Sequence, residues 1–285
     1  MSARIVGWEE YKRLFQIPGT TFDWHILAEG DSWFHFGFTP AIGQPRNLLD
    51  PLEFNKSTVI ASVALSGDTI QHISQPSANP SLLEAMGYRK WNLILVSAGG
   101  NDLIDALSGS YTIKGTTIEI LQPAAAASHF MDYINTIALE SLLDHIENYY
   151  RQFSELRNSE GNGINKDTNI VVHCYDYITA RNAPAVLIGK KLGPWAYKAF
   201  MKHKIPSSQW AYITDYLFER LAERLLRLAN KLPNVVVVNT LNTLHAAEPD
   251  AKGDSNDWAN EIHPNSGGYT KLANKKISPK LALLL

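Results

Sequence analysis

Four short polar segments of this sequence carry residue types that acyl-transfer chemistry requires. Ser32 lies in the stretch LAEGDSWFHFG (residues 27–37), and Gly67, Asn101 and His263 lie in the other three segments. A serine hydroxyl becomes a nucleophile when a base within hydrogen-bond reach takes its proton, and His263 is the candidate base. The oxyanion of the tetrahedral intermediate needs preorganised hydrogen-bond donors. The backbone N–H groups of Ser32 and Gly67 and the side-chain amide of Asn101 can supply them.

Each of these residues also has a structural interpretation. Ser32 can cap a helix that follows a strand, Asn101 can be a helix N-cap, and Gly67 can be required only for a positive φ. His263, which precedes Pro264, can be an ordinary loop histidine. Ser32 or His263 taken alone favours the structural interpretation. The four segments together, in this order, favour catalysis, and capping at Asn101 does not exclude a role in an oxyanion hole.

Five apolar runs rich in valine and isoleucine are predicted to be the strands that position these residues. They span residues 24–30, 57–65, 91–98, 169–175 and 234–240. Four of them are almost continuously apolar rather than alternating, which is typical of strands buried on both faces of a parallel sheet. Ser32, Gly67 and Asn101 follow the first three strands. Because the carboxyl ends of parallel strands meet at one edge of the sheet, we expect these three residues to lie together.

Amphipathic stretches between the strands predict helices. In residues 211–232, leucine and isoleucine recur every three or four positions, and Pro233 ends the stretch. Further helices are predicted over about residues 137–157 and from about residue 267 towards residue 282. Strands that alternate with helices predict an α/β fold with a doubly wound sheet. The sequence contains no internal repeat or linker, so residues 1–285 are expected to form a single domain.

Two insertions are predicted to border the site. The first, near residues 108–122, alternates around Lys114-Gly115 and is predicted to be a β-hairpin. The second, near residues 179–208, directly follows a strand and contains Trp195 and Tyr197, which we predict to contact the substrate.

Aromatic residues also follow the candidate nucleophile. Trp33, Phe34, Phe36 and Phe38 suit core packing better than a substrate wall, although we retain Trp33 as a candidate substrate contact.

Composition excludes several classes of function. Of the 285 residues, 45% are hydrophobic and 19% are charged, and the net charge is -2, so no basic surface for nucleic acid is expected. The sequence has no run of transmembrane length, and its first residues lack the apolar core of a signal peptide. A cytoplasmic protein is therefore the default expectation. A protein exported without a signal peptide would show the same sequence features, so this alternative stays open.

No feature of the sequence predicts a metal or a cofactor. The single cysteine, Cys174, lies in an apolar run and is interpreted as a buried, inert thiol rather than a reactive one. The histidines outside the candidate site show no metal-ligand spacing, and no glycine-rich phosphate loop is present.

The four segments together resemble a known family. EGDSW, LSGDT, GGND and IHPN, in this order, are similar to the four sequence blocks of the SGNH (GDSL-type) hydrolases, over about residues 23–273. This resemblance implies a flavodoxin-like three-layer α/β/α sandwich with a mainly parallel five-stranded sheet. It also implies that Ser32 is the nucleophile, that His263 is the base, and that Gly67 and Asn101 complete the oxyanion hole with Ser32.

The resemblance departs from the family pattern at one position. The family usually has an aspartate three residues before the histidine, and this sequence has Asn260 there. An asparagine carbonyl can accept a hydrogen bond from Nδ1 of His263, but it supplies no negative charge to stabilise an imidazolium. We expect Asn260 to orient His263, with Asp257 as the substitute. Glu261 is expected to point elsewhere, and a backbone carbonyl is the remaining alternative.

The activity implied is hydrolysis of a carboxylic ester or thioester of a small molecule, a lipid or an acylated carbohydrate. Removal of O-acetyl groups from carbohydrate is the alternative within the same chemistry. A second alternative, suggested by Asn260, is a catalytically weak protein that binds a ligand in the same pocket. The acyl chain, the alcohol and the oligomeric state are left open by the sequence.

Overall fold

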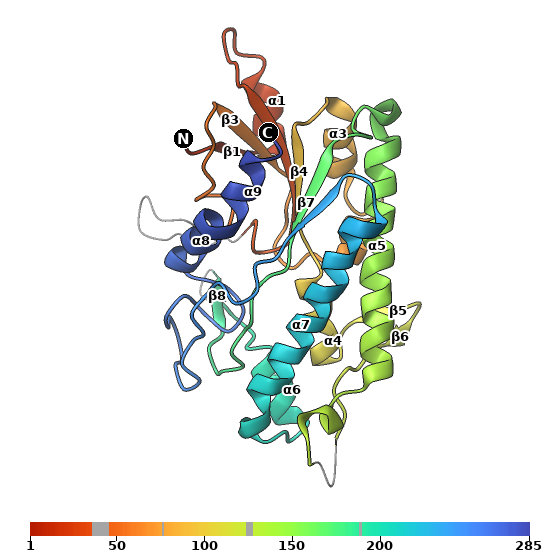
Figure 1. Cartoon of the computed structure of the whole chain (residues 1–285), viewed down its shortest axis with the longest axis vertical. Helices are drawn as coiled ribbons and strands as arrows, with labels where there is room; N and C mark the ends of the chain where they lie inside the picture. Colours follow the sequence, from red (N-terminus) through yellow and green to blue (C-terminus); the bar gives the residue numbers. More distant parts are fainter. Residues whose placement is uncertain (36–45, 76, 124–127, 188–189) are drawn as a thin grey trace.

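A sheet of parallel strands forms the centre of the computed structural model (Figure 1), which describes residues 1–35, 46–75, 77–123, 128–187 and 190–285. Within these residues the central sheet has six strands in the order β1-β3-β2-β4-β7-β10. Their bounds are Arg4–Gly7 (β1), Trp24–Gly30 (β2), Thr58–Ser62 (β3), Leu93–Ser97 (β4), Asn169–His173 (β7) and Val235–Val238 (β10). All five neighbouring pairs are parallel.

The predicted fold class is confirmed, but the predicted number of strands is wrong. Each of the five predicted strands is present, and a sixth, β1, pairs with β3 at the edge of the sheet. β1 has four residues, and of these only Val6 is buried, so it leaves no apolar run that the sequence could reveal. The other five strands follow the order 2-1-3-4-5 along the chain, which is the flavodoxin-like arrangement.

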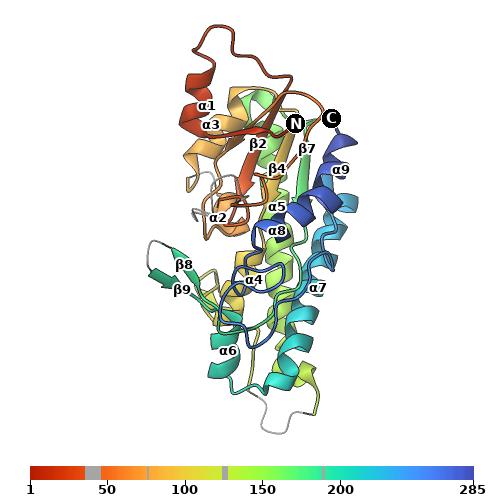
Figure 2. The same ribbon diagram turned by 90° about the vertical axis from the view of Figure 1, so that its left-hand side faces the viewer.

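Helices cover both faces of the sheet. Figure 2 shows α1 and α3 on one side of the strands and α8 and α9 on the other. The bounds of the helices are Trp8–Leu14 (α1), Ile70–Ile73 (α2), Pro80–Tyr88 (α3), Gly100–Ser108 (α4), Thr136–Gly163 (α5), Ala196–Lys202 (α6), Ser207–Lys231 (α7), Ser266–Leu272 (α8) and Ser278–Ala282 (α9). A 3₁₀ helix, Phe130–Tyr133, precedes α5, and a π-helical turn, Ala273–Ile277, joins α8 to α9.

Helix α7 shows why the predicted helices form. Its buried residues include Ile213, Leu217, Leu221 and Leu225, the predicted apolar stripe, and this stripe packs towards the sheet. The helix begins at Ser207, four residues before the predicted start, because its first three residues, Ser207, Ser208 and Gln209, are polar and carry no apolar signal. No helix within the described residues is both long and apolar enough to cross a membrane.

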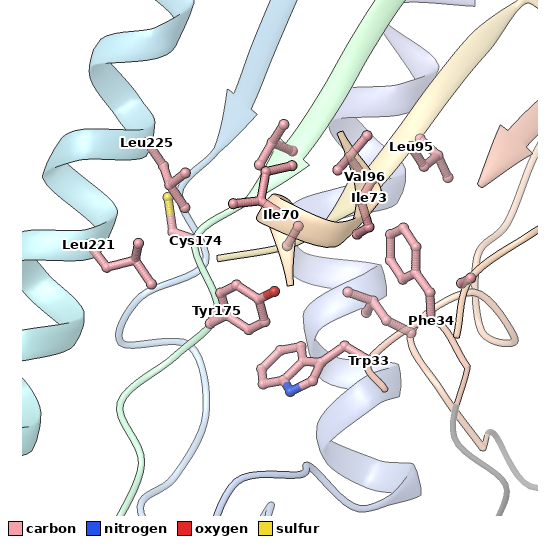
Figure 3. Close-up of a cluster of buried hydrophobic side chains, with 14 of the residues drawn as sticks. Trp33, Phe34, Ile70, Ile73, Leu95, Val96, Cys174, Tyr175, Leu221 and Leu225 are labelled. Atoms are coloured by element: carbon pink, nitrogen blue, oxygen red, sulfur yellow. The ribbon is translucent and has the colours of Figure 1, made fainter. Parts of the chain in front are cut away.

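The interior beneath α7 contains the single cysteine. Figure 3 shows Cys174 beside Leu221 and Leu225, and its side chain is fully buried. Burial raises the pKa of the Cys174 thiol to about 12. The thiol therefore stays protonated at neutral pH, which agrees with the interpretation of Cys174 as an inert core residue.

The carboxyl ends of β2 and β4 approach each other closely at the edge that carries the polar segments. Gly30 and Ser97 are paired in the register of these strands. A Cβ atom added to Gly30 would lie 2.5 Å from the backbone oxygen of Ser97, so only glycine fits there. The next residue, Asp31, donates its backbone N–H to the same Ser97 oxygen at 2.9 Å. This contact fixes the turn that carries Ser32.

Both insertions lie outside the central sheet. β5 (Thr112–Ile113) and β6 (Thr116–Thr117) form the predicted antiparallel hairpin. The second insertion contains a hairpin of β8 (Ala185–Leu187) and β9 (Lys190–Leu192), followed by α6. Figure 2 shows the β8–β9 hairpin projecting from the body of the molecule.

Candidate active site

Ser32, His263 and Asn260 form a connected chain of side chains. The Nε2 atom of His263 lies 2.8 Å from the Oγ atom of Ser32, and the Nδ1 atom of His263 lies 3.0 Å from the Oδ1 atom of Asn260. Ser32 lies in the turn after β2, and the other two residues lie in the loop that precedes α8. All three side chains are buried. The hydroxyl of Ser32 therefore faces the ring that the sequence predicts as its base.

The backbone around Asn260 fixes which atom of its amide faces His263. The N–H groups of Ile262 and His263 both donate to the Oδ1 atom of Asn260, at 3.1 Å and 3.0 Å. A side-chain NH₂ in that place would face two donors, so the amide oxygen must occupy it. The Nδ1 atom of His263 contacts the same oxygen and must carry hydrogen. The Nε2 atom then presents its lone pair to Ser32, which is the tautomer that a general base needs.

Burial governs the charge of His263. It lowers the pKa of the imidazole to about 3, because removal from water disfavours the cation. A neutral asparagine provides no charge to oppose this effect. The ring is therefore neutral over the whole range from mildly acidic to alkaline pH, which is the protonation state that a general base requires.

The two other acidic candidates near His263 have different partners. The carboxylate of Asp257 accepts the backbone N–H of His245 at 2.6 Å and forms an ion pair with Lys271. Glu261 points into the second insertion, where its carboxylate accepts backbone N–H groups that include that of Tyr197 at 2.7 Å. Burial raises the pKa of Glu261 to about 7, although these backbone hydrogen bonds oppose the rise.

A cavity of about 320 Å³ opens in front of Ser32 and His263. Gly67 and Asn101 also line it. Gly67 has a φ of +90°, and a Cβ atom added to it would meet no atom within 4 Å, so its backbone is exposed to the cavity. The Nδ2 atom of Asn101 donates one hydrogen to the backbone oxygen of Asp68 at 2.9 Å. The amide has a second hydrogen, so it can also donate to a ligand in the cavity.

The structural alternatives for two of these residues do not hold. Helix α4 begins with Gly99 at the N-cap position, in a left-handed conformation, and no side chain caps it. Asn101 is therefore not the N-cap, and its side chain lines the cavity while it donates to the backbone oxygen of Asp68. Ser32 does not cap a helix either, because its Oγ atom contacts His263. The neighbouring Asp31 forms the turn instead, by accepting the backbone N–H of Trp33 at 2.9 Å.

A buried polar network lies behind Ser32, and the sequence did not indicate it. The carboxylate of Asp31 accepts hydrogen bonds from the hydroxyl of Tyr175 at 2.6 Å and from the hydroxyl of Ser97 at 2.8 Å. The hydroxyl of Ser97 also contacts the Nε2 atom of His173 at 2.9 Å. Burial raises the pKa of Asp31 to about 6 and lowers that of His173 to about 3. Through Asp31, this network stabilises the turn that carries Ser32.

Tyr175 adopts an unusual backbone conformation to join this network. Its φ is +62°, a left-handed value that is rare for a residue with a large side chain. Its ring lies against Gly100, where a Cβ atom would come within 2.7 Å of the ring. The only signal of this arrangement in the sequence is the second glycine of the GGND segment, which allows the ring to approach the start of α4.

The three predicted substrate contacts have different environments. Trp195 lines the 320 Å³ cavity, and its ring lies edge-on to that of His263 with centroids 6.0 Å apart. Tyr197 lines a separate cavity and packs against Trp210. Trp33 is only 4% exposed and belongs to the core, where Figure 3 shows its ring near that of Tyr175. Phe34 is also buried, and Phe36 and Phe38 lie outside the described residues.

This chain is similar to a family model and to solved structures. Residues 27–275 match the family model of GDSL-like lipases/acylhydrolases. A solved lipase from a goat rumen metagenome, Lip_vut3, is 16% identical with a TM-score of 0.53, and the alignment covers 91% of this chain and 97% of that one. An extracellular lipase from Streptomyces rimosus is 13% identical with a TM-score of 0.49, covering 92% and 99%. No curated protein matches the chain by sequence.

Proposed function

Because this chain belongs to the family of GDSL-like lipases and acylhydrolases, we propose that it is a serine esterase that forms an acyl-enzyme on Ser32. Membership of the family makes the chain a hydrolase. The observation that carries the finer proposal is the contact of 2.8 Å between the Oγ atom of Ser32 and the Nε2 atom of His263. The substrate is a carboxylic ester or thioester.

The first half of the reaction forms the acyl-enzyme. The Oγ atom of Ser32 attacks the acyl carbon while the Nε2 atom of His263 takes the hydroxyl proton. The oxyanion of the tetrahedral intermediate accepts hydrogen bonds from the backbone N–H groups of Ser32 and Gly67 and from the amide of Asn101. The bond to the leaving oxygen, or to the leaving sulfur of a thioester, then breaks, and the protonated Nε2 atom donates its proton to that atom, which releases the alcohol or thiol.

The second half releases the acid. A water molecule attacks the acyl carbon, His263 takes its proton, and the bond to the Oγ atom of Ser32 breaks as the proton returns to that oxygen. Asn260 keeps the ring in the required tautomer throughout. It contributes no charge, so the imidazolium is stabilised less than it would be by an aspartate.

Turnover of p-nitrophenyl acetate by the parent protein and by Ser32→Ala tests this proposal. We expect turnover by the parent, loss of turnover in Ser32→Ala, and labelling of Ser32 alone by a fluorophosphonate probe. Ser66→Ala is the matched control, because Ser66 lines the same cavity but its Oγ atom bonds the backbone oxygen of His35. Labelling that survives Ser32→Ala would contradict the assignment. A parent protein that turns over no ester but still binds one would favour a ligand-binding function.

A further inference from the structure

The second insertion and the loop that carries His263 are joined by a reciprocal exchange of side chains. Glu261, in the histidine loop, accepts the backbone N–H groups of Arg181, Ala196 and Tyr197 at 3.3, 3.1 and 2.7 Å, and also that of Trp195. All four donors lie in the insertion. The backbone N–H of Glu261 also donates to the oxygen of Ala183 at 3.0 Å.

Arg181 completes the exchange in the opposite direction. Its guanidinium, in the insertion, donates to the backbone oxygens of Ala251 and Asn260 at 2.9 and 2.8 Å, both in the histidine loop. The side chains of Arg181 and Glu261 are each only 1% exposed. A buried polar group is costly unless it is hydrogen-bonded, so both groups favour the backbone arrangement that supplies these hydrogen bonds. The insertion and the histidine loop are therefore joined as one hydrogen-bonded unit.

Trp195 is the residue that this unit places in the catalytic cavity. Its backbone N–H binds Glu261, while its ring lies edge-on to the ring of His263. Leu192 and Gly193 line the same wall. The Nε2 atom of His263 must protonate the leaving oxygen of the ester, so the alcohol departs on the side of the histidine. The wall that contains Trp195 therefore borders the place of the leaving alcohol rather than that of the acyl group.

We propose that Glu261 is a positioning residue that holds Trp195 against the leaving-group side of the site, and that the enzyme thereby selects esters of flat, apolar alcohols. This inference rests on the proposed esterase function. A flat aromatic alcohol can pack on an indole ring that is held in one place, whereas methanol or ethanol is too small to use it. This packing can lower the barrier only to acylation, because the alcohol is still bonded to the acyl group in that step alone.

The first experiment probes the position of the insertion without any turnover. In Glu261→Gln, an NH₂ group replaces one of the two oxygens that the four N–H donors share, so the insertion should detach. Limited digestion with trypsin should then cleave after Lys190, Lys191 or Lys198 faster than in the parent. Glu119→Gln is the matched control, because it removes a carboxylate that pairs with Lys202 of α6 at the surface. Equal cleavage in parent, Glu261→Gln and Glu119→Gln would overturn the proposal.

The second experiment compares acetates that share one acyl group. Glu261→Gln should lower kcat/KM for naphthyl acetate by about 10-fold or more, the usual effect of losing apolar pocket contacts, and should change that for ethyl acetate much less. Where deacylation limits kcat, the value of kcat should be the same in variant and parent, because the alcohol has left before that step. Trp195→Ala should give the same pattern, which keeps the test valid if Glu261→Gln folds poorly.

Two results would overturn the selection of the alcohol. One is a uniform loss for all acetates in both variants, which indicates general damage. The other is a loss that follows the length of the acyl chain at constant alcohol. An inactive parent protein would refute the esterase function itself, and the digestion experiment would still decide whether Glu261 positions the insertion.

Discussion

Replacing Asn260 with aspartate places a negative charge beside His263, the proposed base, whose present partner is neutral. At present the Nδ1 atom of His263 lies 3.0 Å from a neutral amide oxygen, and burial lowers the pKa of the ring to about 3. The two backbone N–H groups that bind the Oδ1 atom of Asn260 can bind a carboxylate oxygen equally well. We therefore expect Asn260→Asp to keep the geometry and change the electrostatics.

The size of the change follows from Coulomb's law. Two unit charges about 4 Å apart interact by about 4 kcal/mol at an effective dielectric constant of about 20. An attraction of this size strengthens proton binding by His263 by about 10³-fold, so the pKa of the ring in the variant rises well above the parent's value of about 3. The base must be neutral to act, so the acid limb of the profile of kcat/KM against pH should move to correspondingly higher pH.

At pH values above the acid limb, kcat of Asn260→Asp should be higher than that of the parent. In the serine-protease template, replacing aspartate with asparagine costs about 10⁴ in kcat, partly because the wrong tautomer forms. Here the tautomer is already correct, so we expect Asn260→Asp to raise kcat by less, about 10- to 100-fold.

Profiles of kcat/KM for p-nitrophenyl acetate from pH 4 to pH 9 test this prediction. Asn260→Ala should lower kcat because the ring is freed, and Asp257→Asn should be nearly silent because Asp257 is paired with Lys271. An unmoved acid limb in Asn260→Asp would refute the electrostatic reasoning. A large loss in Asp257→Asn would show that Asp257 is the partner of the base.

Three further predictions concern the proposed oxyanion hole, the packing behind Ser32 and the dependence of stability on pH. Asn101→Ala should lower kcat by about 10²–10³, the usual cost of one lost donor, and a change in KM alone in steady-state kinetics would contradict this. Gly100→Ala should lower the free energy of unfolding by about 1–3 kcal/mol, since its Cβ atom would displace the ring of Tyr175, whereas Gly7→Ala, with open space, should not in parallel denaturant titrations. Burial raises the pKa of Asp102 from 3.8 to about 7, so the folded protein keeps a proton that the unfolded chain has lost and becomes less stable as the pH rises between these values. Denaturant titrations at several pH values should show that the free energy of unfolding depends less on pH in Asp102→Asn than in the parent. The same dependence on pH in both proteins would contradict the role of Asp102.

The sequence predicts those parts of the fold and site that depend on local pattern. Five strands are visible because each is a continuous apolar run, and the parallel order then brings Ser32, Gly67 and Asn101 to one edge. β1 escapes detection because an edge strand of four residues needs little apolar surface. Its pairing with β3 depends on the tertiary structure.

Non-local contacts account for what the sequence could not predict. Tyr175 reaches Asp31 across 144 positions of the chain, and no spacing rule links them. The place of Trp195 and Tyr197 in two different cavities follows from the path of the backbone between them, not from their aromatic character. The direction of Glu261 away from the ring of His263 was predicted from its position, but its partners in the insertion were not.

The two edges of the central sheet are both short. β1 and β10 have four residues each, and they are the outermost strands on either side. An exposed edge is a template on which a strand of another molecule can add, and long flat edges promote aggregation. With so few backbone groups on offer, neither edge can template more than a brief ladder. Self-association by strand addition is thus disfavoured at both edges of the sheet. This reduces the tendency of strands rich in valine and isoleucine to pair with strands of other molecules.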